Sequence, residues 1–174
     1  MGILMGGMVR RLPALLLALA LLLLAARTQQ PAARAQQPAA RDPLVVIVAH
    51  GTGLTNIATS LLRTAFRGEF AEYASGKRFL PLNHPPSSAE RVAFDQAVLG
   101  LDSDAMGRFW IARRIRGEGF APRAYPSASL GLRAVAAYPG AITYMRARQV
   151  TSMVRILTVD GVAHGKPGYS LPSL

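Results

Sequence analysis

The feature that most constrains the fold of this chain is a continuous apolar run, Leu44–Ala49, which reads LVVIVA and leads into His-Gly-Thr-Gly. The run has the length of a strand and consists mainly of β-branched residues, a pattern typical of a strand that is buried on both faces. A sheet with both faces buried needs helices on each side. We therefore expect an α/β domain in which helices flank a sheet built around this strand.

The rest of the sequence predicts further helices and strands in alternation. Helices are expected where apolar residues recur with helical spacing behind a capping residue, and strands where short apolar runs lie between turns. The expected helices begin after Thr55 (with Ile57 in the apolar stripe), at 88–99, at Asp102 or Ser103, and at Ser127 or Ser129, and the expected later strands are 79–82, 141–145 and 154–159. The residues expected to face the core from the helix after Asp102 are Met106, Trp110, Ile111 and Ile115.

The first 35 residues have the order of a secretory signal peptide. Arg10 and Arg11 precede an apolar run of fifteen residues, Leu12–Ala26, and Ala33-Arg34-Ala35 offers small residues at a cleavage site. A membrane-spanning anchor needs roughly 20 apolar residues, so cleavage near Ala35 is the preferred interpretation. The protein is then expected to be periplasmic or secreted, through the general route or, given Arg10-Arg11, the twin-arginine route.

Cleavage at that point leaves 139 of the 174 residues, enough for one domain with an apolar core. Residues 36–43 are small or polar and include proline, so they are expected to be a linker. Residues 44–174 are expected to form the domain.

Charge and cysteine content exclude several classes of function. The formal net charge is +11, and four arginines lie in residues 1–35, so the exported part carries +7. Its basic residues are scattered among acids and do not gather on one face, which argues against a nucleic-acid partner. The chain has no cysteine, which excludes a thiol nucleophile, a disulfide and a thiolate metal site.

The segment His50-Gly51-Thr52-Gly53 raises the hypothesis of a small serine hydrolase, since such enzymes often place an oxyanion-hole loop after a buried strand. A hydrolase also needs a serine in a G-x-S-x-G turn, and none of the serines has this pattern. No catalytic residue is therefore predicted. Asp102 and Asp104 are interpreted as caps of a helix start, because no further ligands lie nearby, and no metal or cofactor is predicted.

The order of motifs between residues 44 and 171 resembles that of the phosphate-transport substrate-binding proteins (PstS-like), which have the type 2 periplasmic binding-protein fold. The matching segments are Leu62-Arg63-Thr64-Ala65-Phe66-Arg67-Gly68, Gly76-Lys77-Arg78-Phe79-Leu80-Pro81-Leu82, Arg91-Val92-Ala93-Phe94, Val98-Leu99-Gly100, Trp110, Gly117-Glu118-Gly119, Pro122, Tyr138-Pro139-Gly140-Ala141-Ile142-Thr143-Tyr144, Val159-Asp160-Gly161 and Gly168-Tyr169. The resemblance implies a single lobe, because the family's transporters are much longer and close two lobes around the ligand. It also implies binding of phosphate or a related oxyanion without catalysis or cofactor, and a membrane permease or another envelope protein as partner.

The resemblance further implies where the anion is held. The family's phosphate loop, typically Arg-Ser-x-Gly-Ser-Gly-Thr-Thr, falls on His84–Arg91. Ser88 matches the family serine, Ser87 a glycine and His84 the arginine, while Arg91 offers a guanidinium one turn into the helix. The helix that begins there also presents free N–H groups and the positive end of its dipole to an anion.

Two residues depart from the family pattern. Glu90 replaces a threonine of the phosphate loop and carries the wrong charge, and Thr143 replaces a glycine of the motif PGAIGY. Ser87 and Glu90 also form an S-x-x-E capping box, so capping alone is an alternative to anion contact. The further residues expected on the same face, each also explicable as a turn or cap, are Thr52, Thr55, Ser127 and Ser129.

Two alternatives to oxyanion binding stay open. The first is an envelope protein-interaction module that keeps the fold without binding solute, which Glu90 and Thr143 favour. The second is the small serine hydrolase, which lacks a nucleophile in the expected pattern.

Overall fold

The structure is a computed structural model that describes residues 42–174, except residue 75. The expected signal peptide, its cleavage site and most of the expected linker lie outside these residues. Asp42 and Pro43 belong to the folded domain, because the backbone N–H of Asp42 donates to the carbonyl of Leu174 and Pro43 forms a bridge with Ser173. In the described part of the chain, no helix combines the length and apolar character that crossing a membrane requires.

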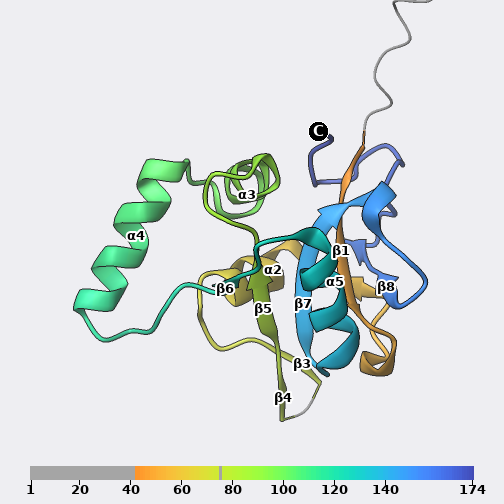
Figure 1. Cartoon of the computed structure of the whole chain (residues 1–174), viewed down its shortest axis with the longest axis horizontal. Coiled ribbons are helices and arrows are strands. Elements are labelled where there is room, and N and C mark those ends of the chain that lie inside the picture. The colour runs from red at the N-terminus through yellow and green to blue at the C-terminus, as the bar shows by residue number, and fades with distance from the viewer. Residues whose placement is uncertain (1–41, 75) are drawn as a thin grey trace, which may run out of the picture. The chain divides into compact units, whose positions relative to one another are not determined.

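The centre of the fold is a mixed sheet of five strands in the order β6-β5-β7-β1-β8 (Figure 1). The apolar run forms β1 (Leu44–Ala49), and all of its residues are buried, as the sequence predicts. Its neighbours β7 (Ala141–Arg146) and β8 (Val154–Ile156) are both antiparallel to it. On the far side of β7, β5 (Leu80–Asn83) and β6 (Arg123–Ala124) follow in parallel.

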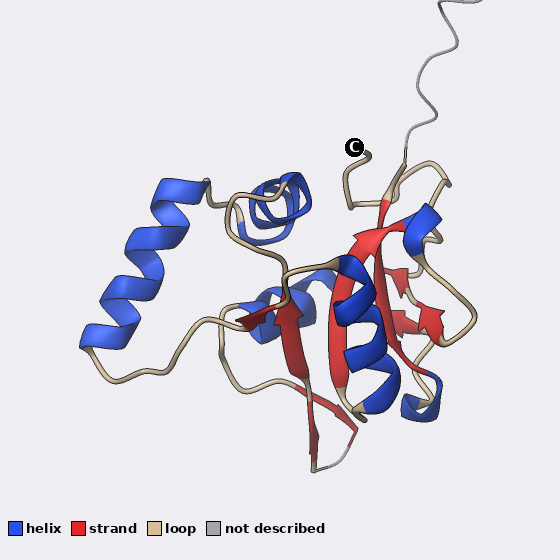
Figure 2. Ribbon diagram, in the orientation of Figure 1, coloured by secondary structure: helices blue, strands red, loops and turns tan. Residues whose placement is uncertain are grey.

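The remaining elements cover or connect this sheet (Figure 2). They are η2 (His50–Thr52), β2 (Asn56–Ile57), α2 (Thr59–Phe66), β3 (Glu72–Ala74), β4 (Lys77–Arg78), α3 (Ala89–Phe94), the π-helical turn η3 (Asp95–Leu99), α4 (Ser103–Ile115), α5 (Ala128–Ala137), η4 (Ala147–Gln149) and β9 (Thr158–Val159). β2 pairs with β9 in parallel, and β3 pairs with β4 as an antiparallel hairpin.

The side chains of the two central strands alternate between two apolar layers, as the period of a strand requires. Val46 and Tyr144 face one layer, which contains residues of α2, α3 and η3. Val45 and Met145 face the other layer, which α5 covers. Helices therefore lie on both faces of the sheet, which confirms the predicted fold class.

The predicted caps of two helices are confirmed, and the predicted start of a third helix is wrong. The side chains of Asp102 and Ser127 accept hydrogen bonds from the backbone N–H groups of Ala105 and Leu130. The first helix, however, begins at Thr59 and is not capped by Thr55. The reason is that residues 55–57 lie against β9 as an extended segment, so that Ile57 is part of a strand.

The prediction that four apolar residues of α4 face the core is also wrong in part. Met106 is buried and Trp110 packs against the core, but Ile111 and Ile115 are 61% and 80% exposed. Residues 106 and 110 are one helical turn apart and share a face. Residues 111 and 115 share another face, which the core does not reach.

Gly140, which directly precedes β7, offers a test of how closely the chain approaches β4 at this point. Its φ is +84°, and a Cβ atom there would lie 2.7 Å from the carbonyl oxygen of Arg78. Gly140→Ala therefore combines backbone strain with a backbone clash, and we expect a loss of about 3 kcal/mol in the free energy of unfolding.

The matched control is Gly53→Ala, because Gly53 has a similar φ of +73° with no atom within 4 Å of the new Cβ. This variant should lose about 1 kcal/mol. Denaturant titration of both variants measures the difference, and equal losses would contradict the close packing at Gly140.

Candidate functional site

The predicted anion loop is held against the sheet by a cluster of buried aromatic rings. The ring of Phe94, at the end of α3, stacks on that of Tyr144 in β7 with centroids 3.7 Å apart and planes 3° from parallel. The ring of Phe66 from α2 tilts against both, at 4.7 and 5.6 Å. All three side chains are buried, so the cluster fixes the position of α3 over β7.

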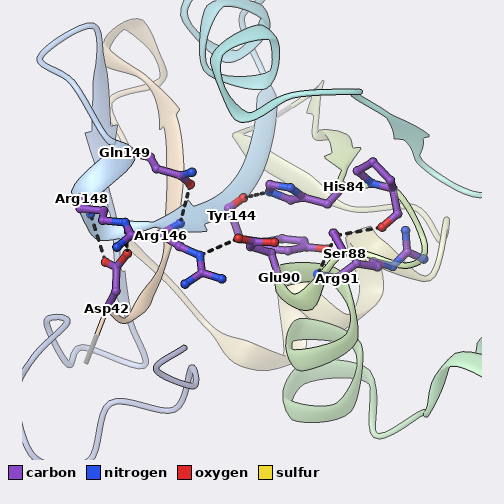
Figure 3. Close-up of polar contacts among 10 residues, drawn as sticks. Asp42, His84, Ser88, Glu90, Arg91, Tyr144, Arg146, Arg148 and Gln149 are labelled. Carbon is purple, nitrogen blue, oxygen red and sulfur yellow. Dashed lines mark hydrogen bonds and ion pairs between the residues drawn. The ribbon is translucent and has the colours of Figure 1, made fainter. Parts of the chain in front are cut away.

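Helical and strand periods then bring two charged side chains together. Glu90 precedes Phe94 by four residues and shares its helix face. Arg146 follows Tyr144 by two residues and shares its strand face. The Nε of Arg146 donates a hydrogen bond of 2.6 Å to Oε1 of Glu90 (Figure 3), and both side chains are largely buried, with 20% and 16% exposed.

Glu90 is therefore an internal anion in the first turn of α3. Burial tends to raise the pKa of its carboxyl, but hydrogen bonds from Arg146 and from its own backbone N–H, together with the charges of Arg146 and His84, outweigh burial. The pKa lies below its usual value of 4.5, so the group is ionised at neutral pH. A carboxylate thus lies in the positive field of the helix start, where an oxyanion ligand was expected.

The cap of α3 is Ser88, and the predicted capping box of Ser87 and Glu90 is wrong. The Oγ of Ser88 accepts a hydrogen bond of 3.2 Å from the backbone N–H of Arg91 and donates one of 2.9 Å to the carbonyl of Pro85. Ser87 is exposed and forms no side-chain hydrogen bond with another described residue. The box fails because the helix starts one residue later than predicted, which leaves the Glu90 carboxylate to Arg146.

His84 lies beside the cap of α3, but its ring already forms a hydrogen bond with β7. Its Nε2 is 2.7 Å from the carbonyl oxygen of Tyr144, and since a carbonyl can only accept, Nε2 carries the proton. Its backbone N–H donates to Oδ1 of Asn83, which also accepts from the hydroxyl of Tyr144. His84 is thus fixed by the strand that it covers.

The guanidinium of Arg91 points away from Glu90 and Arg146 (Figure 3). Its Nε donates to Oδ2 of Asp95, one turn further along, and both residues are buried. In this conformation the guanidinium of Arg91 does not reach the helix start where Glu90 meets Arg146.

Of the four further candidates, the structure brings Ser127 close to His84. Both line a cavity of about 10 Å³, which the side chain of Thr143 also borders. A volume of that order holds about one water molecule and is too small for a phosphate group. The Oγ of Ser129 lies 3.2 Å from that of Ser127 at the start of α5.

The other two candidates lie elsewhere. Thr52 and Thr55 follow the end of β1 that is opposite to the end paired with Arg146. The hydroxyl of Thr52 donates to the carbonyl of Ala49, and the carbonyl of Thr55 accepts from Thr158. The structure therefore places Thr52 in the turn η2 and Thr55 in the extended segment beside β9, and neither lies with the His84–Arg91 loop.

Arg146 is the site residue that the sequence interpretation missed. Its signal was its spacing of two residues from Tyr144, but that spacing has meaning only when α3 is known to pack against β7. A second pair beside it joins Arg148 to Asp42, with 3.0 Å between Nε and Oδ2. The three arginines near the predicted anion loop, 91, 146 and 148, thus each pair with a carboxylate.

The hydrolase hypothesis gains no support from the loop that suggested it. The Nε2 of His50 is 2.9 Å from the backbone carbonyl oxygen of Ser152, and its hydrogen-bond partner is therefore not a serine hydroxyl. Among residues 42–174, with residue 75 left aside, no group of three side chains is placed to hold a metal ion.

Solved structures that are similar to this chain include phosphate-transport proteins. An ABC-type phosphate transport receptor from Vibrio cholerae has a TM-score of 0.56 and 15% identity over 70% of this chain and 48% of its own. PstS from Borrelia burgdorferi has a TM-score of 0.59 and 17% identity over 76% of this chain and 55% of its own. Neither a protein-family model nor a curated protein sequence matches the chain.

This likeness confirms the predicted resemblance at the level of the fold. The chain spans about half the length of these solved structures. Its described domain thus has the α/β architecture found in about half of a phosphate-transport binding protein.

The position of the cap predicts different effects for the two adjacent serines. Ser88→Ala removes the acceptor for the N–H of Arg91 and should reduce the free energy of unfolding by about 1 kcal/mol. Ser87→Ala, as the matched control, should change it by less than about 0.5 kcal/mol, because an exposed side chain without a partner is lost. Denaturant titration measures both free energies of unfolding. A larger loss for Ser87→Ala than for Ser88→Ala would instead favour the predicted capping box of Ser87 and Glu90.

Proposed function

We propose that this protein is an exported, non-catalytic binding module of the phosphate-transport type in which Glu90 takes the place of the oxyanion. The observation that carries the proposal is the buried contact of 2.6 Å between Glu90 and Arg146 in the first turn of α3. In this state the module does not carry free phosphate. It acts through contact with an envelope protein, such as a membrane permease, in the periplasm or outside the cell.

Charge and space support this proposal. A phosphate ion at the start of α3 would compete with a carboxylate that is attached to the same helix and is already ionised. Two anions at one helix start repel each other, and the cationic partners nearby are already paired. The local cavity between His84 and Ser127 gives no room for a second anion.

The second candidate function is that of a phosphate or oxyanion carrier, with His84, Ser87, Ser88 and Arg91 as ligands. The likeness to phosphate-transport structures favours it. It requires that Glu90 leaves Arg146 when the ligand enters. The two candidates therefore differ in how well phosphate binds while the Glu90 carboxylate is present.

Glu90→Thr tests this difference, because threonine is the residue that the resemblance implies here. The variant frees Arg146 and leaves a hydroxyl at the helix start. We expect titration calorimetry to show phosphate binding at least about tenfold tighter than in the unmodified protein, since a charge-assisted hydrogen bond contributes about 1.5–3 kcal/mol.

The matched control is Glu118→Thr, which removes the same charge from the exposed pair that Glu118 forms with Arg116. This variant should bind phosphate no better than the unmodified protein. Tight binding by the unmodified protein would favour the carrier over the interaction module. No gain in Glu90→Thr would contradict the placement of Glu90 in the oxyanion position.

A further inference from the structure

A second hollow lies on another side of α3, away from Glu90. It is a cleft of about 250 Å³ between α3 with η3, α4 and the segment that leads into β6. Most of its wall is apolar. Its lining includes Met106, Trp110, Pro122 and the buried ion pair of Arg91 with Asp95.

This ion pair has unused hydrogen-bonding capacity. Asp95 is 3% exposed, and its Oδ1 has no hydrogen-bond partner among the described residues. Arg91 uses its Nε for Oδ2 of Asp95, and its two terminal nitrogens make no hydrogen bond with any other residue in the described part of the chain. A buried carboxylate oxygen without a donor is costly, so an N–H group that reached it would stabilise the pair.

The pKa of Asp95 is consistent with a carboxylate that lacks a hydrogen-bond donor. Burial raises the pKa of Asp95, and the hydrogen bond and charge of Arg91 offset this only in part. Asp95 also opens the π-helical turn η3, and π turns of this kind are frequent at functional sites.

The charge balance of the cleft decides which chemistry fits. Arg91 and Asp95 already neutralise each other, so a ligand with a net charge would place an unpaired charge against an apolar wall. A neutral group avoids this cost if it offers an acceptor to Arg91 and a donor to Asp95. A carboxamide has both on separate atoms, a carbonyl oxygen that accepts and an N–H group that donates.

We propose that this cleft binds a small neutral molecule with a carboxamide head and an apolar body. The carbonyl oxygen accepts from the terminal nitrogens of Arg91, and the N–H group donates to Oδ1 of Asp95 after a small rotation of that carboxylate. The apolar body lies against Trp110, Met106 and Pro122. The volume suits a ligand of about ten non-hydrogen atoms. This site is independent of the Glu90–Arg146 contact.

Benzamide is a suitable probe, because it combines the proposed head with one ring. Trp110 is the only tryptophan of the chain, so its indole N–H gives a single, assignable resonance. We expect benzamide to shift this resonance with a Kd on the order of 1 mM, as small ligands of this size allow.

Two isosteres of benzamide test the head group without altering the protein. Acetophenone keeps the carbonyl but lacks the N–H donor, and it should bind about tenfold more weakly because the hydrogen bond to Asp95 is lost. Benzoate carries a net charge and should also bind more weakly. If acetophenone bound as tightly as benzamide, Asp95 would not be part of the site. Tighter binding of benzoate than of benzamide would overturn the proposal that the ligand is neutral.

Substitutions at Gly107 test the location. Gly107 lines the cleft from α4, and a Cβ there meets no atom within 4 Å. Gly107→Leu should fill the cleft and abolish the benzamide-dependent shift, whereas Gly107→Ala adds one methyl group and should retain it. A shift that survives in Gly107→Leu, or no shift in the unmodified protein, would overturn the proposal.

Discussion

The stacking of Phe94 on Tyr144 is the interaction on which the rest of the site depends. It fixes one face of α3 over one face of β7, with Phe66 closing the cluster from α2. Once these two faces are opposed, the helical and strand periods determine which side chains meet. Glu90 then lies over Arg146, while Arg91 and Asp95 turn to the cleft beside α4.

Under the function proposed above, the Glu90 carboxylate takes the position of the anion in this fold. The half-length domain shares its architecture with phosphate-transport receptors. Its nearby arginines are each paired with an acid, so the site is balanced without a ligand. This balance is why we propose contact with another protein as the role of the domain.

The sequence predicted the fold well because its signals were local. The buried run at 44–49 and the caps Asp102 and Ser127 depend on neighbours in the chain, and the structure bears them out. The site was harder to predict, because the role of Glu90 depends on Arg146, 56 residues away. The same limit explains why Ile111 was wrongly expected to face the core. The sequence shows that this residue is apolar, but it does not show which face of α4 the core leaves uncovered.

The most direct test of the central claim is a double-mutant cycle on Glu90→Gln and Arg146→Gln, followed by denaturant titration from pH 7 downwards. Because the folded-state pKa of Glu90 is lowered, the pair stabilises the fold above the usual pKa of 4.5 and loses this contribution as the pH falls through the lower folded value. We predict a coupling free energy of about 1–3 kcal/mol at pH 7 that declines towards pH 3. A coupling below about 0.5 kcal/mol at pH 7, or one that does not change with pH, would contradict the account.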